Sequence, residues 1–415
     1  MDRPNRIATC IYTAQPRLRA VSSDGAKVTL SDGKEYIDLM NGKGCVTLGH
    51  HHQAVNAVIA AHLQRKQASA TCWSDRHEEL ANRIIDDTGM DNARLAFFST
   101  GTEACRAAVE AAQMFSGRPL VASAGYHGWG DYWARADGLL EANPSGTIDF
   151  YFVPELLERV LERHRGQVGL VILAPDYIHL QPDTLRRLAE IARRDGVLLC
   201  CDDVKQGYRS VAASQFPKAV GFHADLYTFA KGLANGQRLS CLVGRSDVMA
   251  SAKEFTYTAY FDTIPIISAL ATLDYMANHD GYHRLVHCGA TLAAEMRNAV
   301  RRRELPIEIY GNGPMLQIVG ATKAIDQALY ANCAESGLLL YEGDNQSVSL
   351  ATAGVLDELL QRFDTALIAT LHELGAIDPT PVTLRRRFKA AFRMMDGALD
   401  MISSEQAVQW VREDR

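Results

Sequence analysis

Between residue 61 and about residue 270, short apolar runs alternate with amphipathic patterns of helical period, as in Asp183–Arg194. Each apolar run is bounded by turn-forming residues, which is typical of a buried strand. Alternation of this kind predicts βαβ units and a mostly parallel sheet flanked by helices. The predicted strands are Leu95–Ser99, Leu120–Ser123, Gly169–Leu173, Val197–Cys201, Leu226–Ala230 and Leu239–Val243.

The two ends of the chain carry different patterns. Residues 1–60 favour an extended N-terminal arm, whereas residues 271–415 begin with a long helical pattern and then mix the strand-like stretch Pro306–Val319 with helices. We therefore expect an α/β fold with three parts: the arm (1–60), a large domain (61–270) and a smaller C-terminal α+β domain (271–415). No Pro- or Ser-rich linker separates these parts, so we expect them to pack tightly.

Composition argues against several classes of protein. The 415 residues are 47% hydrophobic and 22% charged, as in ordinary globular proteins. A net charge of −6 argues against nucleic acid as a partner, and no apolar run approaches the ~20 residues that span a membrane. The nine cysteines form no CxxC pair and the N-terminus lacks the apolar core of a secretory signal, so we expect a cytoplasmic protein. The triplet His50-His51-His52 lacks partner ligands at useful spacing, and we expect no metal site there or elsewhere.

Lys231 lies between the apolar run Leu226–Ala230 and the Gly-rich turn Gly232-Leu-Ala-Asn-Gly236. Burial disfavours the charged form of an amine. A lysine that is less strongly held in its charged form can act as a nucleophile toward an aldehyde. A lysine that binds pyridoxal phosphate (PLP) as a Schiff base has this role. Taken alone, a Lys-Gly pair more often ends a helix or turn in solvent, so the interpretation depends on three further segments.

Asp202 follows the apolar run Gly196–Cys201, and α/β sheets place their sites at the carboxyl ends of such strands. A carboxylate there can keep the pyridinium nitrogen of PLP protonated, so that the ring acts as an electron sink. Asp203 is adjacent, and the alternation along the strand does not choose between the two acids. A helix cap or a solvated loop position is the alternative for Asp202.

The hydroxyl-rich turn Ser99-Thr-Gly-Thr102 joins a predicted strand to a predicted helix. Backbone N–H groups at a helix start form an anion site, and the hydroxyls of Ser99 and Thr102 add donors. This arrangement suits a monoester phosphate. The alternative is an ordinary N-cap by Ser99, Thr100 or Thr102.

Tyr126 lies in Gly125-Tyr-His-Gly-Trp129, shortly after the predicted strand Leu120–Ser123. An aromatic ring at this position could stack on one face of a pyridine ring. A loop aromatic that packs on the core is the alternative.

Four motifs occur together in one order and spacing: Ser99-Thr-Gly-Thr-Glu-Ala104, Tyr126-His-Gly128, Asp202-Asp-Val204 and Ala230-Lys-Gly232. In this combination the chain resembles the class III PLP-dependent aminotransferases, which are fold-type I enzymes similar to glutamate-1-semialdehyde aminomutase. The resemblance implies a homodimer with sites at the subunit interface and PLP as the cofactor.

The resemblance also implies a role for each motif residue. Lys231 would carry PLP, and Asp202 rather than Asp203 would lie beside the pyridinium nitrogen. Val204 would lie under the ring and Tyr126 would cover its other face. The residues implied at the phosphate are Ser99, Gly101 and Thr102.

Three further segments narrow the resemblance: Ala174-Pro-Asp-Tyr-Ile-His-Leu180, Asp203-Val-Lys205 and Gly343-Asp-Asn-Gln346. They resemble the 6′-aminotransferases of aminoglycoside antibiotic biosynthesis, of the neomycin and gentamicin type. This implies ping-pong transfer of an amino group from a small-molecule donor, glutamate or glutamine, to a 6′-aldehyde or ketone of an amino sugar. Some relatives instead epimerise the 6′ amine or couple amine chemistry to dehydration. A 6′-epimerase or dehydratase is thus the first alternative, and an amino-acid or diamine aminotransferase the second.

One segment departs from the family pattern near the phosphate. Family members often supply a Thr from the partner subunit, just before an Asn-Pro pair. Ungapped alignment on Pro265 places Tyr260 at that position. Thr258 or Thr263 could substitute for the missing Thr, and both are therefore candidates for binding the cofactor.

A second departure concerns the substrate. Amino-acid-specific relatives often place an Arg in the C-terminal domain to bind a carboxylate bidentately. The segment Gly343–Leu350 offers Asp344 and Asn345 instead. Because an acid suits an amino sugar better than a carboxylate, we expect these two residues, with Tyr126, to contact the substrate. A solvated turn is the alternative.

Overall fold

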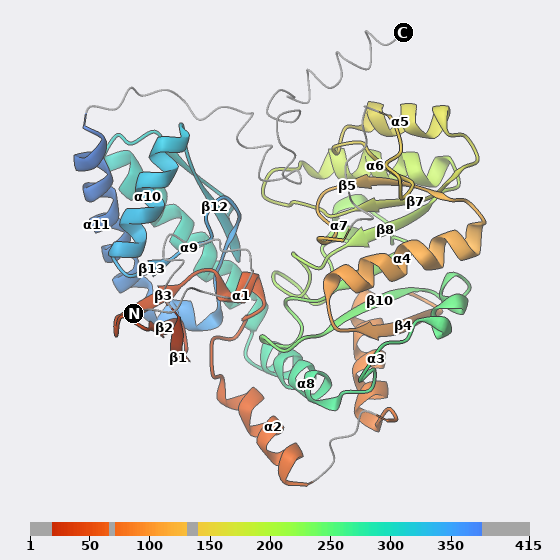
Figure 1. Ribbon diagram of the computed structural model, residues 1–415, viewed down its shortest axis with the longest axis horizontal. Coiled ribbons are helices and arrows are strands. Elements are labelled where there is room, and N and C mark those ends of the chain that lie inside the picture. The colour runs from red at the N-terminus through yellow and green to blue at the C-terminus, as the bar shows by residue number, and fades with distance from the viewer. Residues whose placement is uncertain (1–18, 66–70, 131–139, 376–415) are drawn as a thin grey trace, which may run out of the picture.

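The computed structural model describes residues 19–65, 71–130 and 140–375, which form two lobes (Figure 1). A seven-stranded sheet with the order β4-β10-β9-β8-β7-β5-β6 forms the centre of the larger lobe. β10 is antiparallel to both of its neighbours, and the strands from β9 to β6 are parallel. The strands are β4 (Ala93–Phe98), β5 (Leu120–Ala124), β6 (Thr147–Asp149), β7 (Val168–Leu173), β8 (Leu198–Asp202), β9 (Leu226–Phe229) and β10 (Ser240–Arg245).

All six predicted strands are present, and no end differs from the prediction by more than two residues. β6 was not predicted, because a run of three residues is too short to show a pattern. The predicted mostly parallel α/β sheet is confirmed. Helices cover both of its faces: α3 (Asp75–Thr88), α4 (Gly101–Ser116), α5 (Pro154–Arg163), α6 (Pro182–Arg194), α7 (Phe216–Val220) and the 3₁₀ helix η2 (Val248–Glu254).

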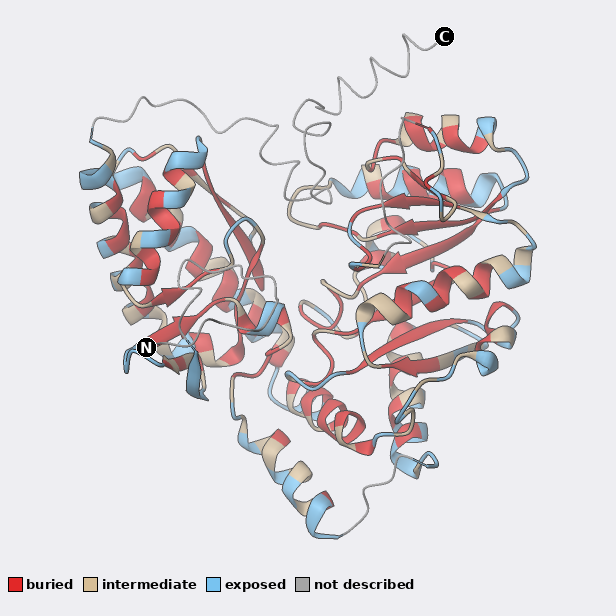
Figure 2. Cartoon of the chain, in the orientation of Figure 1, coloured by how far each residue is buried: buried red, intermediate tan, exposed pale blue. Residues whose placement is uncertain are grey.

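The alternation of side chains along β7 explains why helices pack on both faces. Leu170 and Ile172 belong to the apolar cluster that includes the alanine-rich side of α4. Val171 and Leu173 belong to the opposite cluster, with Leu188 of α6. All of these side chains are fully buried, and each such burial contributes about 1.5–3 kcal/mol to folding. The buried stripes of the helices therefore face the sheet (Figure 2).

The smaller lobe combines strands from both ends of the described chain. β3 pairs in parallel with β13, so the predicted N-terminal arm contributes strands to the C-terminal part. The sheet order is β1-β2-β3-β13, and a second sheet has the order β11-β12-β14. These strands are β1 (Ala20–Asp24), β2 (Lys27–Leu30), β3 (Glu35–Asp38), β11 (Ile307–Tyr310), β12 (Met315–Gly320), β13 (Leu338–Leu339) and β14 (Gln346–Ser347).

The helices of the smaller lobe and of the connection complete the fold. α2 and α8 lie at the base, between the two lobes (Figure 1). His52 is the N-cap of α2, so the histidine triplet lies in a turn and a helix start. None of the described helices is long and apolar enough to cross a membrane. The helices are α1 (Asn41–Gly44), α2 (Gln53–Gln64), α8 (Thr263–Asn278), α9 (Gly281–Arg302), α10 (Lys323–Glu335), α11 (Leu356–Leu374) and the 3₁₀ helix η3 (Leu350–Val355).

Candidate active site

The candidate residues follow strands that end at one edge of the larger sheet. Asp202 ends β8, Lys231 follows β9 by two residues, and Tyr126 follows β5 by two residues. β4, which leads to Ser99, is antiparallel to β10 and so runs in the same direction as β9. The topology therefore gathers at one edge residues that are far apart in sequence, as parallel sheets do.

Asp202 is 3% exposed and its carboxylate accepts hydrogen bonds from two neighbouring elements. Thr228 Oγ1 of β9 donates to Oδ1 at 2.9 Å, and the Val204 N–H donates at 3.1 Å. His127 Nδ1 lies 2.7 Å from Oδ2. Buried carboxylates require such partners, and these fix the direction in which the group points.

Asp203 lies in different surroundings, although it is the next residue. Ser214 Oγ donates to its Oδ2, and Oδ1 has no hydrogen bond with any described residue. Burial raises the pKa of Asp203 to about 7. Of these two adjacent acids, Asp202 is the one whose charge acts on Lys231 and whose carboxylate is held by Thr228, Val204 and His127, which favours it as the partner of the cofactor.

The protonated, charged form of the Lys231 amine is less favoured than in an ordinary lysine. Burial is the main cause that lowers its pKa to about 8, and the positive charges of Lys205 and Arg209 act in the same direction. Asp344 and Asp202 oppose this effect. A lysine in this state can release its proton near neutral pH, as a nucleophile or a proton carrier must.

The predicted phosphate turn forms a close-packed start to α4. Thr100 is the N-cap, and Glu103 reaches back to accept from the N–H groups of Ser99 and Thr100, at 3.0 and 2.7 Å. A methyl group on Gly101 would lie 2.6 Å from Val204 Cγ1, so Gly101 and Val204 are in contact.

The loop after β5 packs against the same turn. A methyl group on Gly128, whose φ is +122°, would lie 2.4 Å from Thr102 Oγ1. Gly101, Thr102, Val204 and Gly128 therefore form one close-packed group, the cradle, beside Asp202. Only glycine permits so close an approach of backbone to side chain.

The remaining candidates for the cofactor lie at the rim. Tyr126 is 55% exposed, so its ring is accessible to a molecule bound at the edge of the sheet. The hydroxyl of Ser99 pairs with that of Tyr257. Thr258 is exposed in the loop between η2 and α8, whereas Thr263 is 3% exposed as the first residue of α8. Of the two threonines, Thr258 is the one accessible at the surface of the chain.

The two predicted substrate residues come from the smaller lobe, and Asp344 contacts the larger one. Lys205 Nζ of the larger lobe lies 2.9 Å from Asp344 Oδ1. Burial opposes ionisation of Asp344, but Lys205 and Lys231 hold its pKa below the ordinary value. Asn345 is 4% exposed, and neither atom of its side-chain amide has a hydrogen bond within the described chain.

Two residues at the site were not assigned from the sequence. His127 was named only inside the Tyr126-His-Gly128 motif, but it is 2% exposed and bound to Asp202. Lys205 was noted only as part of a motif. Atoms of Cys105, His127 and Asp202 lie within 4.8 Å of one another, a spacing that could suit a metal ion. His127 is hydrogen-bonded to Asp202, and Cys105 Sγ lies 3.6 Å from Thr228 Oγ1. Burial raises the pKa of the Cys105 thiol well above its ordinary value.

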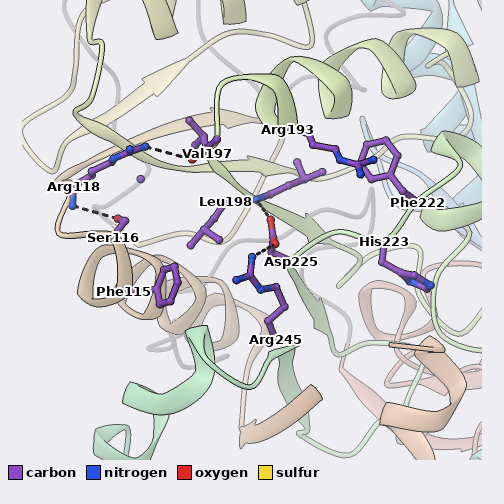
Figure 3. Close-up of a pocket in the computed structure, with 13 residues that line it drawn as sticks. Phe115, Ser116, Arg118, Arg193, Val197, Leu198, Phe222, His223, Asp225 and Arg245 are labelled. Carbon is purple, nitrogen blue, oxygen red and sulfur yellow. Dashed lines mark hydrogen bonds and ion pairs between the residues drawn. The ribbon is translucent and has the colours of Figure 1, made fainter. Parts of the chain in front are cut away.

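A separate cavity of about 570 Å³ lies at the opposite edge of the sheet (Figure 3). Leu198 and Asp225, which line it, stand at the beginnings of β8 and β9 rather than at their ends. Asp225 accepts from the Leu199 N–H at 2.9 Å and pairs with Arg245 at 2.8 Å. These bonds stabilise the sheet edge, and the cavity contains none of the candidate active-site residues.

The residues at the carboxyl edge fit PLP in three respects. A buried carboxylate suits a pyridinium nitrogen, a helix start with close glycine contacts suits a phosphate, and a lysine of lowered pKa suits an aldehyde. These features come from four different strands and their following loops. Their convergence at one edge is the observation that supports the cofactor from the geometry.

Comparison with known proteins gives the family. Residues 12–131 and 157–370 match the model of the class-III aminotransferases. A 2'-deamino-2'-hydroxyneamine transaminase of Streptomyces kanamyceticus is 30% identical over 351 residues, which cover 83% of this chain and 88% of that protein. An aminopentol aminotransferase of Sphingopyxis macrogoltabida is 26% identical and covers 87% of this chain and 89% of its own length.

A solved structure supports the fold. The FumI protein of Sphingopyxis sp. MTA144, a PLP-containing structure, is 24% identical with a TM-score of 0.77, and the match covers 87% of this chain and 90% of that one. The chain belongs to the class-III aminotransferases. It is a PLP-dependent aminotransferase of fold type I, as the sequence predicted.

In an enzyme of this class, each of the described site residues would have a separate role. When bound, PLP supplies an electron sink for the carbon that carries the amine. Asp202, oriented by His127 and Thr228, would hold the pyridinium proton. The start of α4 would bind the phosphate, and Lys231 Nζ would accept and return protons, because its pKa is lowered to about 8.

Proposed function

We propose that this enzyme transfers an amino group to the 6′ carbonyl of an aminoglycoside intermediate, with an amino acid as donor. The observation that carries the proposal is Asp344, an acid of the smaller lobe that reaches the vicinity of Lys231. An acid at this position favours a substrate with ammonium groups over one that offers only a carboxylate. The similar transaminase of Streptomyces kanamyceticus, whose name specifies a neamine derivative as its substrate, supports the same class of substrate.

An isotope experiment tests the proposed reaction. The enzyme is incubated in D₂O with an aminoglycoside whose amine-bearing 6′ carbon also carries a methyl group and is therefore a stereocentre, with and without a keto acid. Amino transfer in the reverse direction predicts a 6′-carbonyl product whose amount depends on the keto acid. Entry of deuterium at the 6′ carbon with inversion, without consumption of the keto acid, would contradict amino transfer.

The second candidate function is 6′-epimerisation, with Cys45 as the candidate for the second acid that this reaction requires. An epimerase needs a second acid on the face of the substrate opposite Lys231. Burial raises the pKa of the Cys45 thiol, which keeps it protonated, and the charges of Arg209 and Lys231 are close enough to oppose that rise. If the enzyme epimerises, Cys45→Ala should abolish inversion while exchange on one face persists. An unchanged rate of inversion in this variant would exclude the thiol.

We further propose a homodimer in which Thr258 reaches the phosphate of the partner subunit. Large apolar side chains are exposed on the single chain, including Trp129 at 84%, Trp73 at 65% and Tyr126 at 55%. Surfaces of this kind usually mark an interface. A fully active monomer in sedimentation velocity would refute the dimer.

We also propose the cytoplasm as the location, because the eight described cysteines are unpaired.

A further inference from the structure

Lys205 and Asp344 form an ion pair that joins the two lobes beside Lys231. Their atoms lie 2.9 Å apart, and the side chains are 30% and 39% exposed. Partly exposed ion pairs contribute little to stability, typically ~0–1 kcal/mol. Such a pair can therefore open at small cost, and both of its members are accessible to a molecule that enters the site.

The proposed reaction, on which this inference rests, requires one site to bind two substrates of opposite character. An amino-acid donor brings a carboxylate. An amino sugar brings several ammonium groups and no carboxylate. A charge that is taken out of water without a partner is strongly unfavourable, so each substrate needs a counter-charge of its own.

We propose that Lys205 and Asp344 are an exchangeable pair that serves the two substrates in turn. Lys205 leaves Asp344 to bind the donor's carboxylate. Asp344 leaves Lys205 to bind an ammonium group of the amino sugar that does not react. In each complex the released partner faces solvent, and in the empty site the two charges neutralise each other.

Asn345 completes the amino-sugar side of this site. It follows Asp344 directly, is 4% exposed, and has both amide atoms without a partner in the described chain. Buried amides are normally hydrogen-bonded. An amide offers one acceptor and one donor group, which match the hydroxyl and amino groups of a sugar ring.

A purely structural salt bridge would make a different prediction. If the pair only held the lobes together, removing either partner would weaken binding of both substrates. An exchangeable pair predicts effects of opposite sign, because each member competes with one substrate for the other member. The sign of the effect, rather than its size, distinguishes the two.

The test uses single-turnover half-reactions of the PLP-loaded enzyme, followed by cofactor absorbance, with glutamate or neamine as the amine. Saturation gives an apparent Kd and a limiting rate for each. Lys205→Met should raise the Kd for glutamate about tenfold or more, because it removes the charged partner of the carboxylate, and should lower the Kd for neamine. Asp344→Asn should do the reverse. Lys27→Met, which removes a partly exposed ion pair with Glu35 and Glu358 in the smaller lobe, is the matched control and should change neither value.

The outcomes separate this inference from the proposed function. If the wild-type enzyme reacts with neamine but both variants weaken both substrates alike, or change neither, the exchangeable pair is wrong and the proposed function stands. If the wild-type enzyme reacts with glutamate and not with neamine or any other amino sugar, the proposed function fails and this inference fails with it. Opposite signs in the two variants support the exchange.

Discussion

At the scale of single residues, two adjacent acids show how surroundings decide chemistry. Asp202 accepts hydrogen bonds from Thr228 and Val204 and contacts His127, whereas Asp203 has Ser214 as its hydrogen-bond donor. The difference arises because successive side chains of a strand point to opposite faces of the sheet. Asp203 is consequently a buried acid whose charged form is poorly compensated.

Asp203 should make the stability of the protein depend on pH. Its pKa is about 7 in the folded chain, against an ordinary value of 3.8. Between about pH 4 and pH 7 the folded chain holds a proton that the unfolded chain has lost, so this contribution to stability falls as the pH rises, by at most ~1.4 kcal/mol per unit.

Asp203→Asn should remove this dependence. Urea unfolding at pH 5 and pH 8 should show that the variant gains stability relative to the wild type at the higher pH. The exposed acid Asp183 provides the control, Asp183→Asn. Equal differences between variant and wild type at both pH values would refute the assignment.

At the scale of elements, the start of α4 and the loop after β5 form the cradle beside Asp202. The sequence predicted the strand, the turn and the helix here, because apolar periodicity and capping residues are local signals. It left open which hydroxyl caps the helix, and the structure assigns Thr100. The contact between Gly128 and Thr102 was not predictable, since no local pattern reports how closely two loops approach.

Gly128→Ala should weaken PLP binding by tenfold or more. The added methyl group would lie 2.4 Å from Thr102 Oγ1, and the φ of +122° is unfavourable for alanine. Gly130→Ala in the same loop is the control, because its methyl group would approach Thr102 Cγ2 only to 3.7 Å. Equilibrium dialysis against PLP measures the effect. The same affinity in both variants would show that the cradle does not hold the cofactor.

At the scale of the whole molecule, Arg209 connects three segments that are distant in sequence. Its Nε donates to Lys205 O at 2.7 Å, its Nη1 to Ser347 Oγ at 3.2 Å, and its Nη2 to Gly44 O. The side chain is 1% exposed, and burial lowers its pKa to about 10. No role for Arg209 could be predicted from the sequence, because a linear pattern does not report contacts with partners 138 and 165 residues away.

Arg209→Lys should destabilise the protein by about 2–4 kcal/mol. A lysine lacks the planar fork that reaches several acceptors, and each buried acceptor left without a donor costs ~1–3 kcal/mol. Arg238→Lys, at an exposed position, is the control. Denaturant unfolding of the two variants measures the difference. A loss below about 0.5 kcal/mol for Arg209→Lys would mean that this side chain does not join the segments.

The division of the chain into parts also belongs to this scale. The parallel pairing of β3 with β13 brings the first described strands to the C-terminal lobe, a long-range contact that the extended pattern of the arm did not reveal. The exact domain limits stay a prediction. The separation of the lobes matters for function, because Lys231 belongs to one and Asp344 to the other.

The most direct test of the central claim is to identify the lysine that carries PLP. Borohydride reduction of the PLP-loaded enzyme, followed by proteolysis and mass spectrometry, should place the cofactor on Lys231. Lys231→Ala should show no such label and no turnover, whereas Lys205→Met should still be labelled at Lys231. A label on Lys205, Lys43 or any other lysine in the wild-type enzyme would contradict the site described for this protein.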